Sequence, residues 1–161
     1  MINLGNHYLY IEKNYELMKK YYLMAIDNNY SMAMNNLGYY YHYIEQNYEL
    51  AKKYFLMAID NNNSNAMVNL GEYYRYIEKN YELAKKYYLM AINNNNSDAM
   101  NNLGRYYEEI EKNYELAKNY YLMAINNNNS YANYNLSHYY YKIEKNDELA
   151  KKYYSMAMGH K

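Results

Sequence analysis

The histidines are the side chains of this sequence best suited to acid–base or metal chemistry. They are His7, His42, His138 and His160, and the chain has no cysteine that could add a thiol nucleophile or a thiolate ligand. Only His42 has a carboxylate at helical spacing, Glu45, and one such pair falls short of the ligand set of a zinc site. The sequence therefore predicts no catalytic, cofactor-binding or metal site, and no enzyme.

The charge balance argues against nucleic acid and membranes as general partners. Lys and Arg together number 17, as do Asp and Glu, so the formal net charge is zero and the basic surface that attracts phosphates is missing. The longest apolar runs are six residues, such as 21–26, far short of the roughly 20 that cross a bilayer. RNA binding through stacked tyrosines, one base per helical repeat, stays a less favoured alternative.

The elements that must position any site are internal repeats. A leucine recurs every 33 residues, and each except the last is followed by glycine, the last being followed by Ser137. The leucines are Leu4, Leu37, Leu70, Leu103 and Leu136. We expect one repeat domain over 1–161, made of the units 1–31, 32–64, 65–97, 98–130 and 131–161. Positions 33 residues apart are called a column below.

Each unit is predicted to be a helical hairpin. In the third unit, apolar residues recur at three- and four-residue spacing over 65–77 and again over 81–92. Side chains able to accept from the first free amides precede both helices. We predict as caps Ser64, Ser97 and Ser130 for the first helices and Asn80, Asn113 and Asn146 for the second.

Alanine placement predicts close helix packing. The alanines fall in three columns, represented by Ala66, Ala84 and Ala91, although the chain's high Tyr and Asn content is typical of AT-rich coding that does not favour alanine. Together with the glycine column, these small residues would let helix axes approach to the short end of the 8–10 Å range. The sequence therefore predicts an all-α solenoid of five 33-residue hairpins, an α-α superhelix.

The repeated motifs resemble a known family. Asn-Leu-Gly-x-Tyr-Tyr, then Tyr-Glu-Leu-Ala-Lys-Lys-Tyr-Tyr, then Met-Ala-Ile is similar to the tetratricopeptide superfamily, most closely its Sel1-like branch. The eight-residue step from Ala58 to Ala66 is similar to Sel1-like units, whereas the short break at 78–80 resembles an ordinary tetratricopeptide turn, so both branches stay open. The resemblance implies a right-handed superhelix whose first helices line a concave, partner-binding face.

Differences among the five copies predict where a partner binds. They concentrate in four columns, which spacings of four, three and one place on one side of the first helix. Drift on an exposed surface is the alternative explanation. We call the predicted partner-binding residues the first-helix face; they are Asn35, Tyr39, His42, Tyr43, Glu72, Arg75, Tyr76, Asn101, Arg105, Glu108, Glu109, Tyr134, His138, Tyr141 and Lys142.

The centre of this face is predicted to carry a charge quartet. Glu72 and Arg75 lie three residues apart, and Arg105 and Glu108 repeat the spacing in reverse order. Stacking would pair Glu72 with Arg105 and Arg75 with Glu108. With Asp98 and Glu109 the region is slightly acidic, and exposed tyrosine rings accept cations, so we expect a mild preference for a basic ligand.

Two further columns have structural explanations. An asparagine precedes each repeated leucine, as at Asn36 and Asn69, and we favour hydrogen bonding between repeats over peptide binding. The lysines of the second helices, such as Lys52 and Lys53 after Glu49, are interpreted as solvated pairs along one helix.

We therefore expect a non-catalytic adaptor or scaffold that binds a peptide or protein surface through its first-helix face. A structural spacer or self-associating array is the alternative, because Met1 falls inside a helical pattern and 157–161 add no polar capping helix. The cysteine-free sequence favours the cytoplasm, or the host cytoplasm if the source is a virus.

Overall fold

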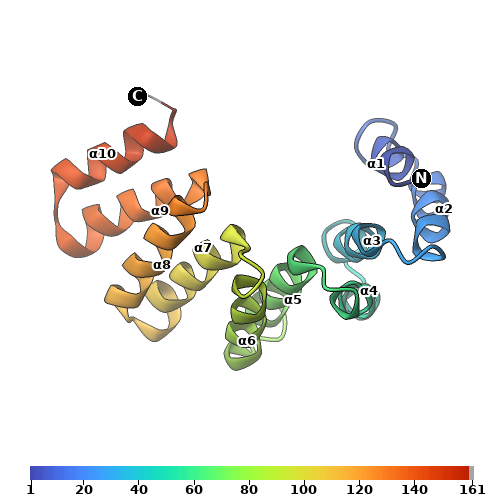
Figure 1. Ribbon diagram of the computed structural model, residues 1–161, viewed down its shortest axis with the longest axis horizontal. Helices are drawn as coiled ribbons and strands as arrows, with labels where there is room; N and C mark the ends of the chain where they lie inside the picture. Colours follow the sequence, from blue (N-terminus) through green and yellow to red (C-terminus); the bar gives the residue numbers. More distant parts are fainter. Residues whose placement is uncertain (160–161) are drawn as a thin grey trace. The chain divides into compact units, whose positions relative to one another are not determined.

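The computed structural model describes residues 1–159, so the predictions that involve His160 and Lys161 lie outside the described residues. All regular elements in that range are helical, which confirms the all-α class (Figure 1). By its internal contacts the chain divides into two compact units, Met1–Ala84 and Lys85–Lys161. They are called unit 1 and unit 2.

The helices alternate as first and second members of hairpins. Unit 1 contains α1 (Ile2–Tyr10), α2 (Tyr15–Ile26), α3 (Ser31–Tyr43), α4 (Tyr48–Asp60) and α5 (Ser64–Tyr76). The boundary between the units falls within α6 (Tyr81–Ile92). Unit 2 continues with α7 (Ser97–Tyr106), the π-helical turn η1 (Tyr107–Glu111), α8 (Tyr114–Asn126), α9 (Ser130–Tyr139), η2 (Tyr140–Glu144) and α10 (Asp147–Ala157).

Asparagine caps both kinds of helix. Before the second helices the predicted caps are confirmed: Asn80 accepts from the Leu83 amide at 3.1 Å, with the same bond at Asn113 and Asn146. Before the first helices the prediction is wrong by one residue, because the caps are not serines. The acceptors are Asn63, Asn96 and Asn129, each bonded to the alanine amide three residues later.

The serine caps are displaced by the tight turn that joins consecutive hairpins. Asn62, Asn95 and Asn128 have φ near +60°, the left-handed region in which asparagine is enriched. The next asparagine then has extended backbone and caps the helix, so serine becomes its first residue. Within each hairpin a lysine or glutamine takes the left-handed position, as Lys79 and Lys112 do.

Small residues set the contact inside a hairpin. The alanine columns are buried throughout, with Ala157 partly exposed. A Cβ on Gly38 would lie 2.7 Å from the Phe55 ring, and one on Gly104 would lie 2.7 Å from the Tyr121 ring. The first helix therefore needs glycine where an aromatic ring of the second helix lies against its backbone.

Candidate protein-interaction surface

One of the four variable columns is exposed in all five copies. In the other three columns, exposure differs from copy to copy. The exposed column is Tyr10, Tyr43, Tyr76, Glu109 and Lys142. Of the other predicted residues, Tyr39, Tyr134, His138 and Tyr141 are exposed, and Asn35, Glu72, Arg105 and Glu108 are half-buried. His42, Arg75 and Asn101 are buried, so these three can support a bound partner only from behind the surface.

His42 shows why part of this face is interior. Its ring lies among aromatic rings of α4 and α5, with centroids 5.5 Å from Tyr48, 6.3 Å from Phe55 and 6.1 Å from Tyr73. Its Nδ1 atom is buried and has no hydrogen-bond partner among residues 1–159. Burial lowers the pKa of His42, so the ring is neutral at pH 7 and packs as part of this aromatic cluster.

Unit 1 presents a tyrosine patch on this face. The rings of Tyr39 and Tyr43 pack with centroids 4.4 Å apart, and the Tyr43 hydroxyl donates to Glu72 Oε2 at 3.1 Å. Burial, reinforced by the Glu72 carboxylate, raises the pKa of Tyr43, which keeps its hydroxyl a donor at neutral pH. The Arg75 guanidinium carbon lies 5.0 Å from the Tyr76 ring centroid. The patch therefore combines exposed aromatic area with one half-buried carboxylate.

Unit 2 contains a groove of about 440 Å³ on the same face. Six residues of the predicted face line it: Arg105, Glu108, Glu109, Tyr134, His138 and Lys142. Sequence reasoning missed Lys112 and Tyr114, which belong to the turn and to the start of α8 and also line the groove. Lys112 and Tyr114 could have been found by including the turn between the two helices of the hairpin in the predicted partner-binding surface.

The carboxylates of this groove are held in place. Glu108 accepts from the Tyr121 hydroxyl at 2.8 Å, and its other oxygen lies 3.9 Å from His138 Nδ1. Arg105 Nε lies 3.4 Å from Glu109 Oε1. The predicted pairs Glu72–Arg105 and Arg75–Glu108 each join a residue of unit 1 to one of unit 2 and stay a prediction.

The asparagine column links neighbouring hairpins, as predicted. Asn36 Nδ2 donates to Asn6 Oδ1 at 3.0 Å, Asn69 donates to Asn35 at 2.9 Å, and Asn135 donates to Asn101 at 2.7 Å. Two residues of the predicted face, Asn35 and Asn101, are thus committed to hydrogen bonds between repeats. These two residues therefore hold neighbouring first helices together and do not offer their side-chain oxygens to a partner.

A lysine–glutamate ladder on the second helices was missed. Lys52 Nζ bonds to Glu78 Oε1 of the next hairpin at 2.9 Å, and Lys85 and Lys118 bond to Glu111 and Glu144 at 2.7 Å; Lys19 pairs with Glu45 in the same way. The interpretation as pairs along a single helix is therefore wrong for Lys52 and Lys85. The signal that could have found the ladder is a constant offset of 26 residues between lysine and glutamate columns.

Each ladder lysine also lies over rings of the following hairpin. The Lys52 ammonium is 5.6 Å and 5.1 Å from the ring centroids of Tyr73 and Tyr74, close enough for a cation–π contribution. The Glu78 carboxylate also accepts from the Tyr73 hydroxyl at 2.8 Å. The Lys52 hydrogen bond lowers the pKa of Glu78, so the pair stays ionised at neutral pH.

Neither a metal centre nor a membrane span is found within residues 1–159. No group of three or more His, Asp or Glu side chains in this range could hold a metal ion. No helix in the same range is long and apolar enough to cross a bilayer.

Comparisons with known proteins place the chain among helical-repeat proteins. The family model of the Sel1 repeat matches residues 1–30, 31–63, 64–96, 97–129 and 130–157. The fold is similar to a Sel1 repeat protein from Oxalobacter formigenes, with a TM-score of 0.80 and 22% identity over 99% of this chain and 72% of that chain. It is also similar to an immunity protein from Pseudomonas aeruginosa, with a TM-score of 0.74 and 24% identity over 99% of this chain and 67% of that chain. The MamA protein gives a TM-score of 0.66 at 19% identity, over 99% and 88% of the two chains. No curated protein matches the sequence.

The family match settles the choice between the two branches that the sequence left open. Each matched segment contains one hairpin, and from the second segment onward each begins one residue before the unit expected from the leucine column. The helical-hairpin solenoid expected from the repeats is confirmed. The chain belongs to the Sel1 repeat family, a tetratricopeptide-like family whose members are generally protein-interaction modules.

Proposed function

We propose that the chain is a non-catalytic adaptor that holds a peptide or a protein segment along its first-helix face. The observation that carries this proposal is the groove of unit 2. Six residues chosen from differences among the copies line one hollow there, together with Lys112 and Tyr114. Residues that vary between structurally equivalent copies and also share a concave surface are expected of a recognition site.

The chemistry of the face favours a ligand with both polar and cationic side chains. In unit 1, Tyr39 and Tyr43 offer ring faces beside the Glu72 carboxylate, an arrangement that attracts a lysine or arginine side chain. In unit 2, Glu108 and Glu109 are balanced by Arg105, Lys112 and Lys142. A basic side chain is therefore favoured at the tyrosine patch of unit 1, and the groove of unit 2 suits a segment of mixed charge.

The test is selection from a displayed library of random 12-residue peptides, followed by fluorescence polarisation with the enriched peptides. We expect enriched peptides to contain Lys or Arg and to bind the Tyr39→Ala, Tyr43→Ala, Tyr76→Ala triple variant at least about tenfold more weakly. These tyrosines are exposed, so the helical circular dichroism signal should persist.

The matched control changes Lys53 and Lys86 to Gln. Both are exposed on second helices and stand outside the ladder, unlike Lys52 and Lys85. Peptide binding that survives the tyrosine changes and is lost in this control would move the site to the second-helix surface. If no peptide is enriched, the spacer alternative replaces the adaptor proposal.

A further inference from the structure

The junction between the first two hairpins serves as a template for a contact between two chains. One core cluster joins Met18, Tyr22 and Ala25 of α2 to Leu37 and Tyr40 of α3. The pair Lys19–Glu45 flanks this cluster. The rings of Tyr15 and Tyr40 also meet there, with centroids 5.2 Å apart. A second helix and the next first helix thus meet through apolar, ionic and aromatic contacts in fixed columns.

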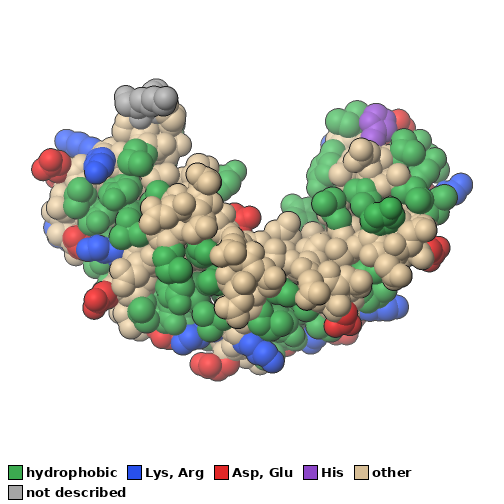
Figure 2. Space-filling model, in the orientation of Figure 1, with side chains coloured by type: hydrophobic (Ala, Val, Ile, Leu, Met, Phe, Trp, Pro, Cys, Tyr) green, Lys and Arg blue, Asp and Glu red, His purple; other side chains and the backbone are tan. Residues whose placement is uncertain are grey.

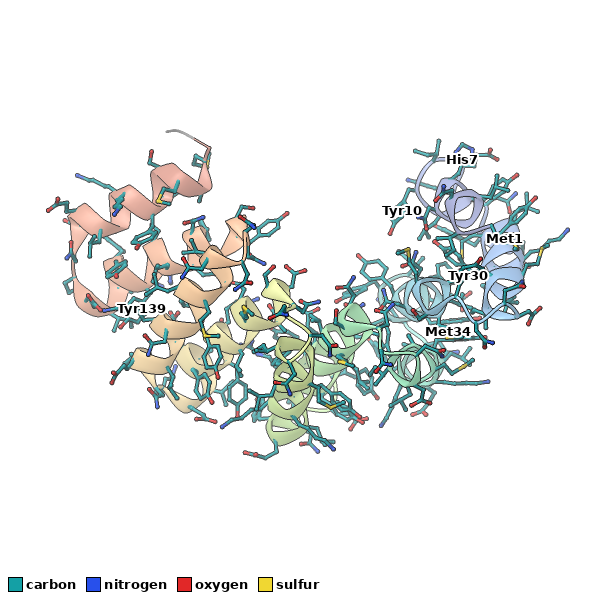
Figure 3. All side chains as sticks on the ribbon, in the orientation of Figure 1. Met1, His7, Tyr10, Tyr30, Met34 and Tyr139 are labelled. Carbon is teal, nitrogen blue, oxygen red and sulfur yellow. The ribbon has the colours of Figure 1, made fainter. Side chains whose placement is uncertain are left out.

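The first hairpin exposes the side of α1 that such a contact would cover. Leu4 is 45% exposed, although every other leucine of its column is completely buried, and Met1 is 49% exposed. Figure 3 shows His7 on the side of α1 that faces away from α3, and Figure 2 shows hydrophobic side chains over this end of unit 1. We call Met1, Leu4, His7 and Glu12 the head face.

The head face already has the internal bond that the junctions use. His7 Nε2 lies 2.8 Å from Glu12 Oε1, in the columns where Tyr40 and Tyr73 donate to Glu45 and Glu78 at 2.9 and 2.8 Å. Glu12 is therefore held in the place from which a glutamate meets the lysine of a preceding hairpin.

The fifth hairpin exposes the complementary surface. A hollow of about 480 Å³ lies on α9 and α10, lined by residues that include Asp147, Ala150, Lys151 and Tyr154. Tyr154 is 50% exposed, whereas the other four aromatic residues of its column are at most 1% exposed. Lys151 occupies the ladder column and has no carboxylate partner in the part of the chain that the structure describes. We call these four residues the tail face.

The two faces depart from the repeat pattern in complementary ways. The column of Tyr15 and Tyr48 contains Asp147 in the fifth hairpin, and the column of Tyr40 contains His7 in the first. At the junctions these columns meet ring to ring, as at Tyr48 and Tyr73 with centroids 6.4 Å apart. Joining tail to head in the junction register would place the Asp147 carboxylate against the His7 ring and the Lys151 ammonium against the Glu12 carboxylate.

We propose that two copies of this chain associate head to tail, with the head face of one seated on the tail face of the other. The contact has different surfaces on its two sides, so a further copy can add at each free face. This inference does not rest on the proposed partner-binding function, because the head face and the tail face contain no residue of the first-helix face, although Tyr141 of that face also lines the hollow.

The first experiment is sedimentation velocity on the 161-residue chain over a hundredfold dilution. We expect the weight-average mass to rise with protein concentration and the rise to shrink in high salt, because two polar pairs flank the contact. A constant monomer mass over the whole range would overturn the proposal.

Variants that block one face each distinguish this contact from symmetric dimers. Leu4→Asp blocks the head and Tyr154→Asp blocks the tail, and we expect each variant alone to be monomeric. An equimolar mixture should form a dimer and nothing larger, since only one good head and one good tail remain in each pair. Association of Leu4→Asp by itself would show a tail-to-tail contact and overturn the proposal.

Charge reversal keeps the test valid if a blocking change disturbs folding. Glu12→Lys or Lys151→Glu alone should raise the dissociation constant about tenfold, and the chain carrying both changes should recover most of the loss. The control is Lys53→Glu, an equal charge reversal outside the ladder column, which should leave association unchanged. Equal weakening by the control, or no recovery in the double variant, would overturn the assigned register.

Discussion

The fourth and fifth hairpins differ in how their second helix packs, although their sequences follow the same columns. In the fourth, Tyr121 of α8 is 1% exposed and lies against Gly104 of α7. In the fifth, Ser137 stands in the place of glycine, its hydroxyl donates to the Ala150 carbonyl at 2.7 Å, and Tyr154 of α10 is half exposed. The fifth hairpin thus differs at this ring in two respects, because serine replaces the glycine and no described hairpin follows α10.

The same comparison applies to the variable columns. His42 of the second hairpin is buried among rings of α4 and α5, while Tyr141, in the same column of the fifth hairpin, is exposed. A column therefore does not have one burial state. Its residues are interior where another hairpin covers them and surface where no described residue does.

The largest effect is expected from Gly104→Ala. In an open helix this change would stabilise by about 1 kcal/mol through helix propensity. Here the new Cβ would lie 2.7 Å from the Tyr121 ring and 3.2 Å from the Ala117 carbonyl oxygen. We expect the free energy of unfolding to fall by about 1–3 kcal/mol in urea denaturation followed by circular dichroism.

A double-mutant cycle with Tyr121→Ala is the control. With the ring removed, Gly104→Ala should lose most of its cost. A single Gly104→Ala variant that is more stable than the wild type would show that the Tyr121 ring does not require glycine at position 104.

The sequence was sufficient for the architecture because its signals are local and repeated. Leucine, glycine and alanine columns report which side of each helix is buried, and this prediction holds for Ala66, Ala84 and Ala91, all fully buried. Asn80 as a cap and Asn69 as a link between repeats were also predicted, since an asparagine beside a helix start or a small-residue column has few other partners.

The parts that could not be predicted depend on contacts between hairpins. Lys52 follows Glu49 on one helix, so helical spacing suggested an ion pair within that helix. In the structure Lys52 bonds to Glu78 of the next hairpin. His42 was assigned to the surface because its column varies, although in its own copy aromatic rings enclose it. The cap was predicted at Ser64, one residue after the observed cap Asn63, because the left-handed turn at Asn62 is not visible in composition.

A smaller effect is expected at the ladder, where the fourth and fifth hairpins again differ. Lys118 of α8 bonds to Glu144 at 2.7 Å and lies 5.6 Å from the Tyr140 ring centroid, whereas Lys151 of α10 has no such partner among residues 1–159. Lys118→Gln should lower the free energy of unfolding by about 0.5–1 kcal/mol, less in high salt, because the pair is partly exposed.

Lys151→Gln is the matched control and should leave the free energy of unfolding unchanged. Both variants are to be measured by urea denaturation at a protein concentration low enough for the monomer. Equal losses from the two variants would mean that the lysine stabilises its own helix, and the ladder would then contribute nothing between hairpins.

The last prediction tests the burial of His42 by the pH dependence of the free energy of unfolding. Burial lowers the pKa of His42 below its ordinary value of 6.5, so the unfolded chain binds a proton more readily than the folded chain. The free energy of unfolding should therefore be highest above pH 7, fall as the pH drops through 6.5, and level off below the lowered pKa. The hydrogen bonds from Lys19 and Lys52 lower the pKa of Glu45 and Glu78, so the contribution of these two carboxylates is lost only at pH values below 4.5, outside the pH range of the test. In urea midpoints measured between pH 7.5 and pH 5, His42→Phe should remove most of the slope. A slope that persists in His42→Phe would assign the titration to another group and contradict the interior placement of His42.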